Sequence, residues 1–157
     1  ERFDLDELIL SETAGQFASI RQLYRDLGKH CFMELERDAL VRLLQSVEAR
    51  EHTTTLVATG GGICDNEAAV ALMHASGTII YLHVAQEALY QRIAAAGIPP
   101  FLEGSNPREA FDKLYAERDG RYGKIADLVL KLTEWESVEH NATLLCNSSV
   151  ALLEGQR

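Results

Sequence analysis

Apolar and polar positions follow two different periods along the chain. Three short runs, at 54–59, 78–84 and 127–132, are mostly apolar or β-branched, and such runs are typical of buried strands. Elsewhere the apolar residues recur every three to four positions, which predicts amphipathic helices. The longest helical pattern consists of Phe32, Leu35, Ala39, Leu40, Leu43 and Val47.

Capping residues, glycines and prolines divide the helical pattern into separate helices. A helix that begins near residue 19 ends at Gly28, which favours a helix stop. Asp65 is the expected cap of a helix over 65–74, and the pair Asn106 and Pro107 starts another helix. The remaining predicted helices are a short one at 8–12, one at 86–95 and a closing one at 135–153.

Strands that alternate with helices at this spacing form right-handed βαβ units. The predicted fold class is therefore α/β, a parallel sheet with helices on both faces. No repeat or linker-like stretch interrupts the pattern, so we expect a single domain over 1–157. Only three strands are convincing, with the remnant of a fourth at 1–3, and so small a sheet has open edges. We therefore expect a further strand and helix upstream of residue 1.

The charge balance and the scarcity of metal-ligand motifs narrow the function. Lys plus Arg total 15 and Asp plus Glu total 24, and the net charge of −9 argues against non-specific nucleic-acid binding. No apolar run approaches the roughly 18 residues that a membrane span needs. The three cysteines form no CxxC pair, and the five histidines lack zinc-site spacing. We expect a cytoplasmic protein without a membrane or nucleic-acid partner.

Acidic residues and glycines follow two of the predicted strands. Asp4 and Asp6 come after the first strand remnant, and Gly60, Gly61 and Gly62 come after the next strand. Ligands of open α/β sheets bind beyond the carboxyl ends of the strands, so these residues are expected at one edge. Glycines let backbone amides approach an anion closely, and a carboxylate beside a phosphate suggests Mg²⁺. The alternative is structural, because a DxD is usually a helix cap and a triple glycine is often only a turn.

Four segments follow one another from Asp4 to about Leu130: DLDELI, SIRQLYRDLGKHCFMELE, VATGGGI and NPREAFDKLYAERDGRYGKIADLVL. In this order they resemble the shikimate kinase family. The resemblance implies a P-loop kinase fold of the nucleoside-monophosphate-kinase-like, three-layer type, with a lid at 98–106. It also implies ATP and Mg²⁺ as cofactors and phosphorylation of a hydroxyl on a small acid, shikimate to shikimate 3-phosphate, in aromatic amino acid biosynthesis.

The resemblance assigns a role to each matching position. Asp4 would hold Mg²⁺ through water, and Asp6 would orient the substrate hydroxyl and accept its proton. Arg118 would bind the substrate carboxylate through its bidentate guanidinium. Arg92 would lie near the adenine of ATP, or be a solvated surface charge. The three glycines Gly60, Gly61 and Gly62 would lie against the substrate and the transferred phosphate.

The chain departs from the family pattern at three points. An arginine that grips the substrate carboxylate is replaced by Met33, and a lid arginine is replaced by Pro99. Arg121 and Arg108 are candidate replacements for these lost cations. No GxxxxGK[ST] phosphate loop occurs in the 157 residues, and in the family that loop precedes the DxD. The missing loop falls where the topology also calls for another strand and helix.

Three functions are compatible with these residues. The first is the ATP-dependent kinase, acting as a monomer on a small-molecule acid. The second is a kinase-like domain that senses a ligand without transferring phosphate, which the exchanges at Met33 and Pro99 favour. The third is a related small-molecule kinase with a different acceptor, which would keep Asp6 and Arg118 but loosen the grip on the carboxylate.

Overall fold

The structure of the chain is a computed structural model, and it describes residues 1–48, 54–102, 104, 106–133 and 137–155. The strands are Arg2–Asp4 (β1), Leu56–Ala58 (β2), Ile80–Val84 (β3) and Leu128–Leu132 (β4). The helices are Leu5–Glu12 (α1), Ile20–Glu48 (α2), Glu67–Ser76 (α3), Gln86–Ala95 (α4), Pro107–Ile125 (α5) and Val138–Gly155 (α6). Two short 3₁₀ turns are Ile63–Asp65 (η1) and Pro100–Leu102 (η2).

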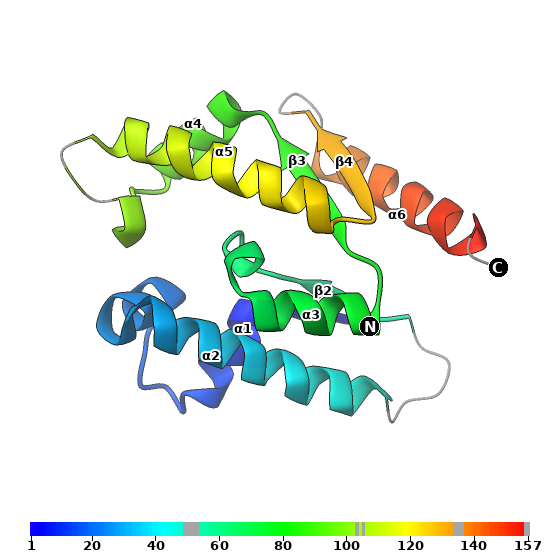
Figure 1. Cartoon of the computed structure of the whole chain (residues 1–157), viewed down its shortest axis with the longest axis horizontal. Helices are drawn as coiled ribbons and strands as arrows, with labels where there is room; N and C mark the ends of the chain where they lie inside the picture. The colour runs from blue at the N-terminus through cyan, green and yellow to red at the C-terminus, as the bar shows by residue number, and fades with distance from the viewer. Residues whose placement is uncertain (49–53, 103, 105, 134–136, 156–157) are drawn as a thin grey trace.

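The four strands form two parallel pairs (Figure 1). In one pair β1 lies beside β2, with Arg2 opposite Leu56, and in the other β3 lies beside β4, with Ile80 opposite Leu128. Among the described residues no ladder joins β2 to β3. The α/β class and the parallel strands are confirmed, and the expected upstream strand stays a prediction. Two small pairs rather than one sheet leave the strands half-exposed, and Leu56 and Leu82 are 48% and 44% exposed.

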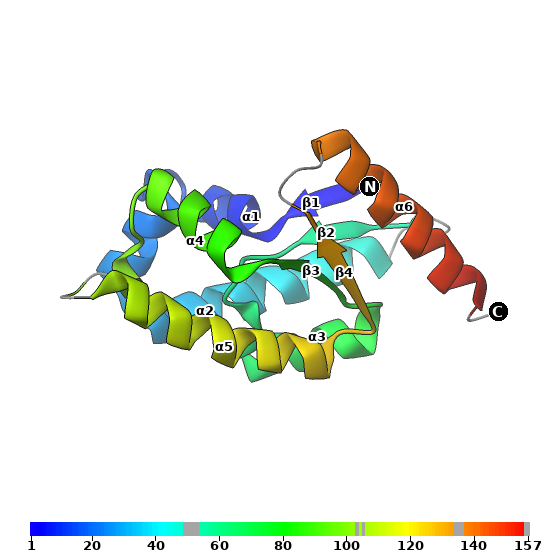
Figure 2. The same ribbon diagram turned by 90° about the horizontal axis from the view of Figure 1, so that it is seen from above.

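The helices cover the strands from both sides. Figure 2 shows α2, α3 and α5 on one side of the strands and α6 on the other, while α1 and α4 continue from the carboxyl ends of β1 and β3. Parallel strands need such crossover helices, and the predicted layering on both faces is confirmed. Among the described residues, no helix combines the length and the hydropathy that crossing a bilayer requires.

The contiguous hydrophobic core lies among α1, α2, α3 and η1. Leu5 and Ile9, four residues apart on α1, are buried against Leu23 and Leu40 of α2, as the helical period predicts. Ile63 of η1 joins the same cluster and so ties the turn after β2 to the core. This packing fixes the positions of β1, α1 and the glycine turn relative to one another.

The long helix α2 contains a sharp change of direction at Gly28. The backbone there has φ 79° and ψ 173°, a left-handed value that a residue with a side chain rarely adopts. The predicted end of one helix at Gly28 and the separate pattern over 32–47 are both confirmed, although the second segment follows the first directly. A new helical segment therefore begins immediately after Gly28.

Two sequence expectations need correction. Asp65 does not cap the helix after the glycines. Asn66 does, and its side chain accepts from the backbone N–H of Ala69. The closing helix begins at Val138 instead of Trp135, and residue 135 lies outside the described residues. In the expected lid, residues 100–102 form the 3₁₀ turn η2 with Leu102 buried, while residues 103 and 105 are not described.

Candidate functional site

Asp4 and Asp6 lie where β1 passes directly into α1. Asp4 is the N-cap, and its Oδ1 accepts from the backbone N–H groups of Asp6 (2.9 Å) and Glu7 (3.3 Å). The structural reading of the DxD therefore holds for Asp4. Asp6 is half-buried beside Gly60, and burial together with the charge of Asp4 raises the pKa of its carboxyl group.

The glycine turn lies between Asp6 and Arg118. A methyl group added at Gly60 would lie 3.4 Å from Asp6 Oδ1, and one added at Gly62 would lie 3.1 Å from Arg118 Nη2. A methyl group at Gly61 would meet nothing within 4 Å. The turn is thus enclosed on two sides and open at its middle residue. The expected position of Asp6 beside the glycines agrees with these distances, and Arg118 lies at the same edge.

Asp65 is the residue that fastens α5 to this edge. Its Oδ2 accepts from Arg118 Nη2 at 3.0 Å and lies 3.7 Å from Lys29 Nζ, and its Oδ1 accepts from Arg121. Burial alone would raise the pKa of Asp65, but the hydrogen bond from Arg118 and the charges of Arg118, Lys29 and Arg121 lower it. A single carboxylate therefore holds three basic side chains from two helices.

Glu36 is a buried carboxyl group behind this cluster. It is 2% exposed and accepts from Asn66 Nδ2 at 3.2 Å, and the same amide donates to the backbone carbonyl of Met33 at 2.7 Å. Burial raises the pKa of Glu36 to about 7, reinforced by the charge of Asp6 and partly offset by the Asn66 hydrogen bond. Protonated Glu36 is thus well populated near neutral pH.

Arg118 also meets the short turn that precedes α5. Its guanidinium lies over the ring of Phe101, 5.6 Å from the centroid, and Phe101 in turn packs edge-on against Tyr24 at 6.3 Å. Arg118 Nε is buried and has no hydrogen-bond partner among the described residues. A buried donor without an acceptor costs stability unless a ligand satisfies it. Because this atom is enclosed, an acceptor group of a ligand can reach it only if the side chains around it move.

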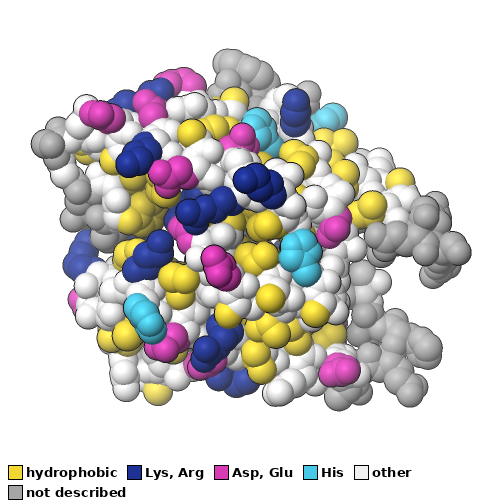
Figure 3. Space-filling model, viewed as in Figure 1, with side chains coloured by type: hydrophobic (Ala, Val, Ile, Leu, Met, Phe, Trp, Pro, Cys, Tyr) yellow, Lys and Arg dark blue, Asp and Glu magenta, His cyan; other side chains and the backbone are white. Residues whose placement is uncertain are grey.

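The candidate cations are divided between this site and the molecular surface. Arg121 joins the Asp65 cluster, whereas Arg108 pairs with Glu87 and Asp112 and lies over the Tyr90 ring. Arg92 is exposed on α4 and, within the described part of the chain, is not among the basic side chains that pair with Asp65. Basic side chains lie along α5 and in the band between α5 and α2 (Figure 3).

Sequence reasoning missed the parts that Asp65 and Lys29 play. The sequence predicts Asp65 as a helix cap because it precedes a helical pattern, but the neighbouring Asn66 is an equally good cap and leaves Asp65 free to bind basic side chains. No motif in the sequence assigns a role to Lys29. Its position one helical turn before Met33 was the signal available in the sequence, since residues four apart share a helix face.

The described residues contain no group of three side chains that could hold a metal ion. Asp4 Oδ1 is engaged by two backbone amides, which leaves the other carboxylate oxygen of Asp4 for a contact to a metal or its water. These residues do not make a complete magnesium site. Magnesium in phosphotransferases is commonly held by substrate phosphates and water, with only one or two carboxylates.

Comparison with known proteins identifies the class and then the family. The solved structure described as shikimate kinase from Acinetobacter baumannii in complex with shikimate matches the whole chain and 80% of its own, with a TM-score of 0.76 and 23% identity. The shikimate kinase structure from Bacteroides thetaiotaomicron matches 96% of the chain and 83% of its own, with a TM-score of 0.69 and 23% identity. These likenesses define a P-loop kinase fold.

Sequence comparison then shows the family. A family model described as shikimate kinase matches residues 1–146. The shikimate kinase of Stenotrophomonas maltophilia strain K279a is 31% identical over 149 residues, 92% of this chain and 78% of that protein. That of Aromatoleum aromaticum is 38% identical over 100 residues, 62% of this chain, and the match spans 57% of that protein's length. The chain belongs to the shikimate kinase family, whose members use ATP.

Proposed function

We propose that this protein transfers the terminal phosphoryl group of ATP to a hydroxyl of a small carboxylic acid, with shikimate as the acceptor and shikimate 3-phosphate as the product. The observation that carries the proposal is the convergence of three features at one edge. The Asp6 carboxylate faces Gly60, and the Arg118 guanidinium faces Gly62 across the same short turn. A carboxylate base and a guanidinium separated by backbone amides suit a substrate with a hydroxyl and a carboxylate.

Asp6 is the proposed base. The acceptor hydroxyl gives its proton to the Asp6 carboxylate as its oxygen bonds to the terminal phosphorus, and the bond from that phosphorus to the bridging oxygen breaks to release ADP. The raised pKa of Asp6 supports this role, because a carboxylate with a higher proton affinity is a better proton acceptor.

Arg118 is the proposed partner of the substrate carboxylate. Two of its donor atoms differ in their hydrogen bonds: Nη2 donates to Asp65, whereas Nε is buried without an acceptor among the described residues. Gly60, Gly61 and Gly62 would let the substrate and the transferred phosphate approach the backbone, and the open position at Gly61 suits this contact. The Phe101 ring lies against the Arg118 guanidinium, where it would help to exclude water from the site.

The nucleotide side of the reaction rests on fewer residues of this chain. No GxxxxGK[ST] sequence occurs among the 157 residues, so none of them is assigned to the ATP phosphates. Arg92 stays the proposed neighbour of the adenine, and Asp4 stays the proposed contact to Mg²⁺ through water. Magnesium, when bound with ATP, would neutralise phosphate charge. We also propose that 1–157 forms one domain, because Asp65 ties α5 to the turn after β2.

The test is ADP release with and without shikimate, measured on the protein expressed from its complete gene. We expect shikimate at millimolar concentration to stimulate ADP release, and phosphorus NMR to show a phosphate monoester of shikimate. Stimulation by another hydroxy acid but not by shikimate would contradict the acceptor and support the kinase with a different substrate. ADP release that no hydroxy acid stimulates would contradict phosphotransfer.

A second candidate function is ligand sensing without phosphotransfer. Two observations favour it: Met33 and the buried Pro99 stand where the family pattern has arginines. Both exchanges remove a cation from the neighbourhood of anionic ligands. Shikimate binding measured by calorimetry, combined with no ADP release by the same preparation, would support this candidate.

A further inference from the structure

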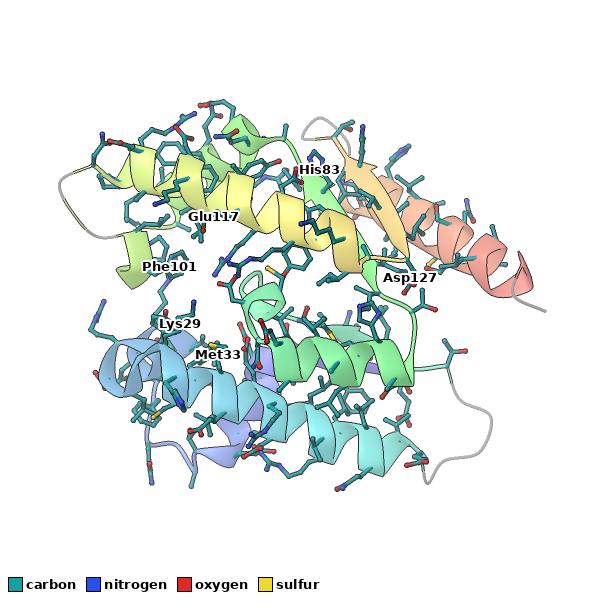
Figure 4. The ribbon with its side chains drawn as sticks, in the orientation of Figure 1. Lys29, Met33, His83, Phe101, Glu117 and Asp127 are labelled. Atoms are coloured by element: carbon teal, nitrogen blue, oxygen red, sulfur yellow. The ribbon has the colours of Figure 1, made fainter. Side chains whose placement is uncertain are left out.

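Lys29 and Met33 share the face of α2 that is turned toward α5. Gly28 starts a new helical segment, so Lys29 begins it and Met33 follows one turn later on the same side. Figure 4 shows both side chains on α2 beneath Phe101 of η2, in the region between α2 and α5. The cation that the family pattern has at Met33 is thus absent, but a different cation stands one turn earlier.

Lys29 reaches the same carboxylate oxygen as Arg118. Lys29 Nζ lies 3.7 Å from Asp65 Oδ2, and Arg118 Nη2 lies 3.0 Å from that same oxygen. The two cations are thus close enough together for one carboxylate to contact both, as the Asp65 carboxylate does. The distance from Lys29 exceeds that of an ordinary hydrogen bond, so the ammonium donors are not saturated by Asp65.

Around Asp65 the hydrogen-bond donors of the basic side chains outnumber the acceptors available to them. Asp65 is almost fully enclosed, with a side chain 9% exposed, and it already accepts from Arg118 and Arg121. Arg118 Nε is buried without an acceptor, and the Lys29 side chain is 59% exposed and able to change its rotamer. Asp4, Asp6 and Glu36 are the other acidic groups near this edge. Glu36 is engaged by Asn66 and is charged only in part near neutral pH.

We propose that Lys29 binds the carboxylate of the acceptor together with Arg118, and so takes the place of the cation lost at Met33. This inference rests on the proposed function, since it names a further group in the same acceptor site. A lysine reaches the site as a flexible point charge, whereas an arginine at position 33 would be a planar fork. The grip on the carboxylate is therefore retained with a different geometry.

The alternative is that Lys29 only neutralises Asp65. In that case its removal would lower the stability of the protein but would not alter how the site distinguishes a charged ligand from an uncharged one. The ratio of affinities for shikimate and for its methyl ester separates the two roles, because the ester keeps every hydroxyl and loses only the negative charge.

The experiment measures the Kd of shikimate and of its methyl ester by calorimetry, with the protein expressed from its complete gene. The variants are Lys29→Ala, Lys29→Arg and, as the matched control, Lys113→Ala, an exposed lysine of α5 away from Asp65. We expect Lys29→Ala to weaken shikimate binding about tenfold and to leave ester binding unchanged, since a charge-assisted contact to a carboxylate is lost. Lys29→Arg should restore most of the affinity, and Lys113→Ala should match the unaltered protein.

The outcomes separate this inference from the proposed function. If the unaltered protein binds shikimate and Lys29→Ala leaves the ratio of the two affinities unchanged, the role of Lys29 is wrong while the proposed function stands. If the unaltered protein binds neither compound, the proposed acceptor is wrong and the role of Lys29 falls with it. Thermal melting of each variant, with Lys29→Gln as a second uncharged variant, excludes unfolding as the cause of lost binding.

Discussion

The two halves of the molecule are built differently. The half from β1 to α3 contains the contiguous core, in which Leu5, Leu23 and Ile63 are almost completely buried. The half from β3 to α6 has few deeply buried residues and is held by polar and aromatic contacts instead. These contacts include Tyr81 to Asp119, Tyr115 to the carbonyl of Val84, the stack of Tyr81 on Tyr122, and Arg108 to Glu87 and Asp112.

The difference explains where the site lies. The well-packed half supplies Asp6, Glu36 and Asp65, whose positions are fixed by the core, while the other half supplies Arg118 and Arg121. The halves meet through the Asp65 cluster and through Phe101 against Tyr24. Because Arg118 and Arg121 lie in the half with fewer deeply buried residues, their side chains can adjust to a ligand carboxylate.

The largest expected effect is the loss of activity on substitution of Asp6, in the half from β1 to α3. Asp6→Asn keeps the size of the side chain but removes the proton acceptor, so we expect kcat to fall by about 10²–10⁴-fold while shikimate binding changes little. Steady-state kinetics and calorimetry on the same preparations measure both quantities. Asp26→Asn, on the exposed side of α2, is the control and should keep full activity. A fully active Asp6→Asn would remove Asp6 from the mechanism.

The buried core of the half from β1 to α3 can be tested through protein stability. Leu23 is 0% exposed in the core, whereas Leu27, one turn further along α2, is 40% exposed. We expect Leu23→Ala to lower the free energy of unfolding by about 3 kcal/mol and Leu27→Ala by less than about 1 kcal/mol. Urea denaturation measures both. Equal losses at the two positions would show that the assigned core does not dominate the stability of this half.

Glu36, in the half from β1 to α3, makes the free energy of unfolding depend on pH, and the sign of this dependence follows from its raised pKa. Its pKa is about 7 in the folded protein against an ordinary value of 4.5, so the folded state keeps a proton that the unfolded chain releases. The stability contributed by this residue is complete below pH 4.5 and is lost as the pH rises toward 7. Glu36→Gln keeps a side chain of the same shape without the charge. We expect it to stabilise the protein by about 1–2 kcal/mol at pH 8 and to have little effect at pH 4.

The measurement is the difference in unfolding free energy between Glu36→Gln and the unaltered protein at several pH values. Glu34→Gln, on the exposed side of the same helix, is the matched control and should show no such trend. A difference that is independent of pH, or that shrinks as the pH rises, would contradict the raised pKa of Glu36.

The smallest expected effect tests the contact between the halves at Gly62 and Arg118. A methyl group at Gly62 would lie 3.1 Å from Arg118 Nη2, so Gly62→Ala should displace the guanidinium and weaken shikimate binding about fivefold. Gly120→Ala adds the same group to α5, where nothing lies within 4 Å, and should leave binding unchanged. Calorimetry distinguishes the two variants. Unchanged affinity in Gly62→Ala would mean that Arg118 is not held against the glycine turn when ligand is bound.

Local features of the fold could be predicted from the sequence, and long-range pairings could not. The helix Gln86–Ala95 has the predicted bounds, and Asn106 with Pro107 starts α5 as expected, because caps and prolines act on neighbouring residues. Asp65 was assigned to the wrong task because its partners Arg118 and Arg121 are more than fifty residues away. The separation of the strands into two pairs likewise depends on tertiary contacts that no local pattern contains.

In the candidate site too, residues next to local motifs could be predicted from the sequence, and long-range contacts could not. The sequence could indicate Asp6, the glycines and Arg118, because each follows a strand end or matches a motif position. It could not indicate the buried carboxyl of Glu36 against Asn66, which depends on how α2 packs on α3. Nor could it separate Arg121 from Arg108, since only the fold directs one toward Asp65 and the other toward Glu87.

A crystal structure of the protein with shikimate bound would show how the acid lies in the site. We expect its carboxylate about 3 Å from the Arg118 guanidinium, with its acceptor hydroxyl beside the Asp6 carboxylate and its ring against Gly61. Shikimate bound elsewhere, or bound here with the carboxylate turned away from Arg118, would contradict this expectation.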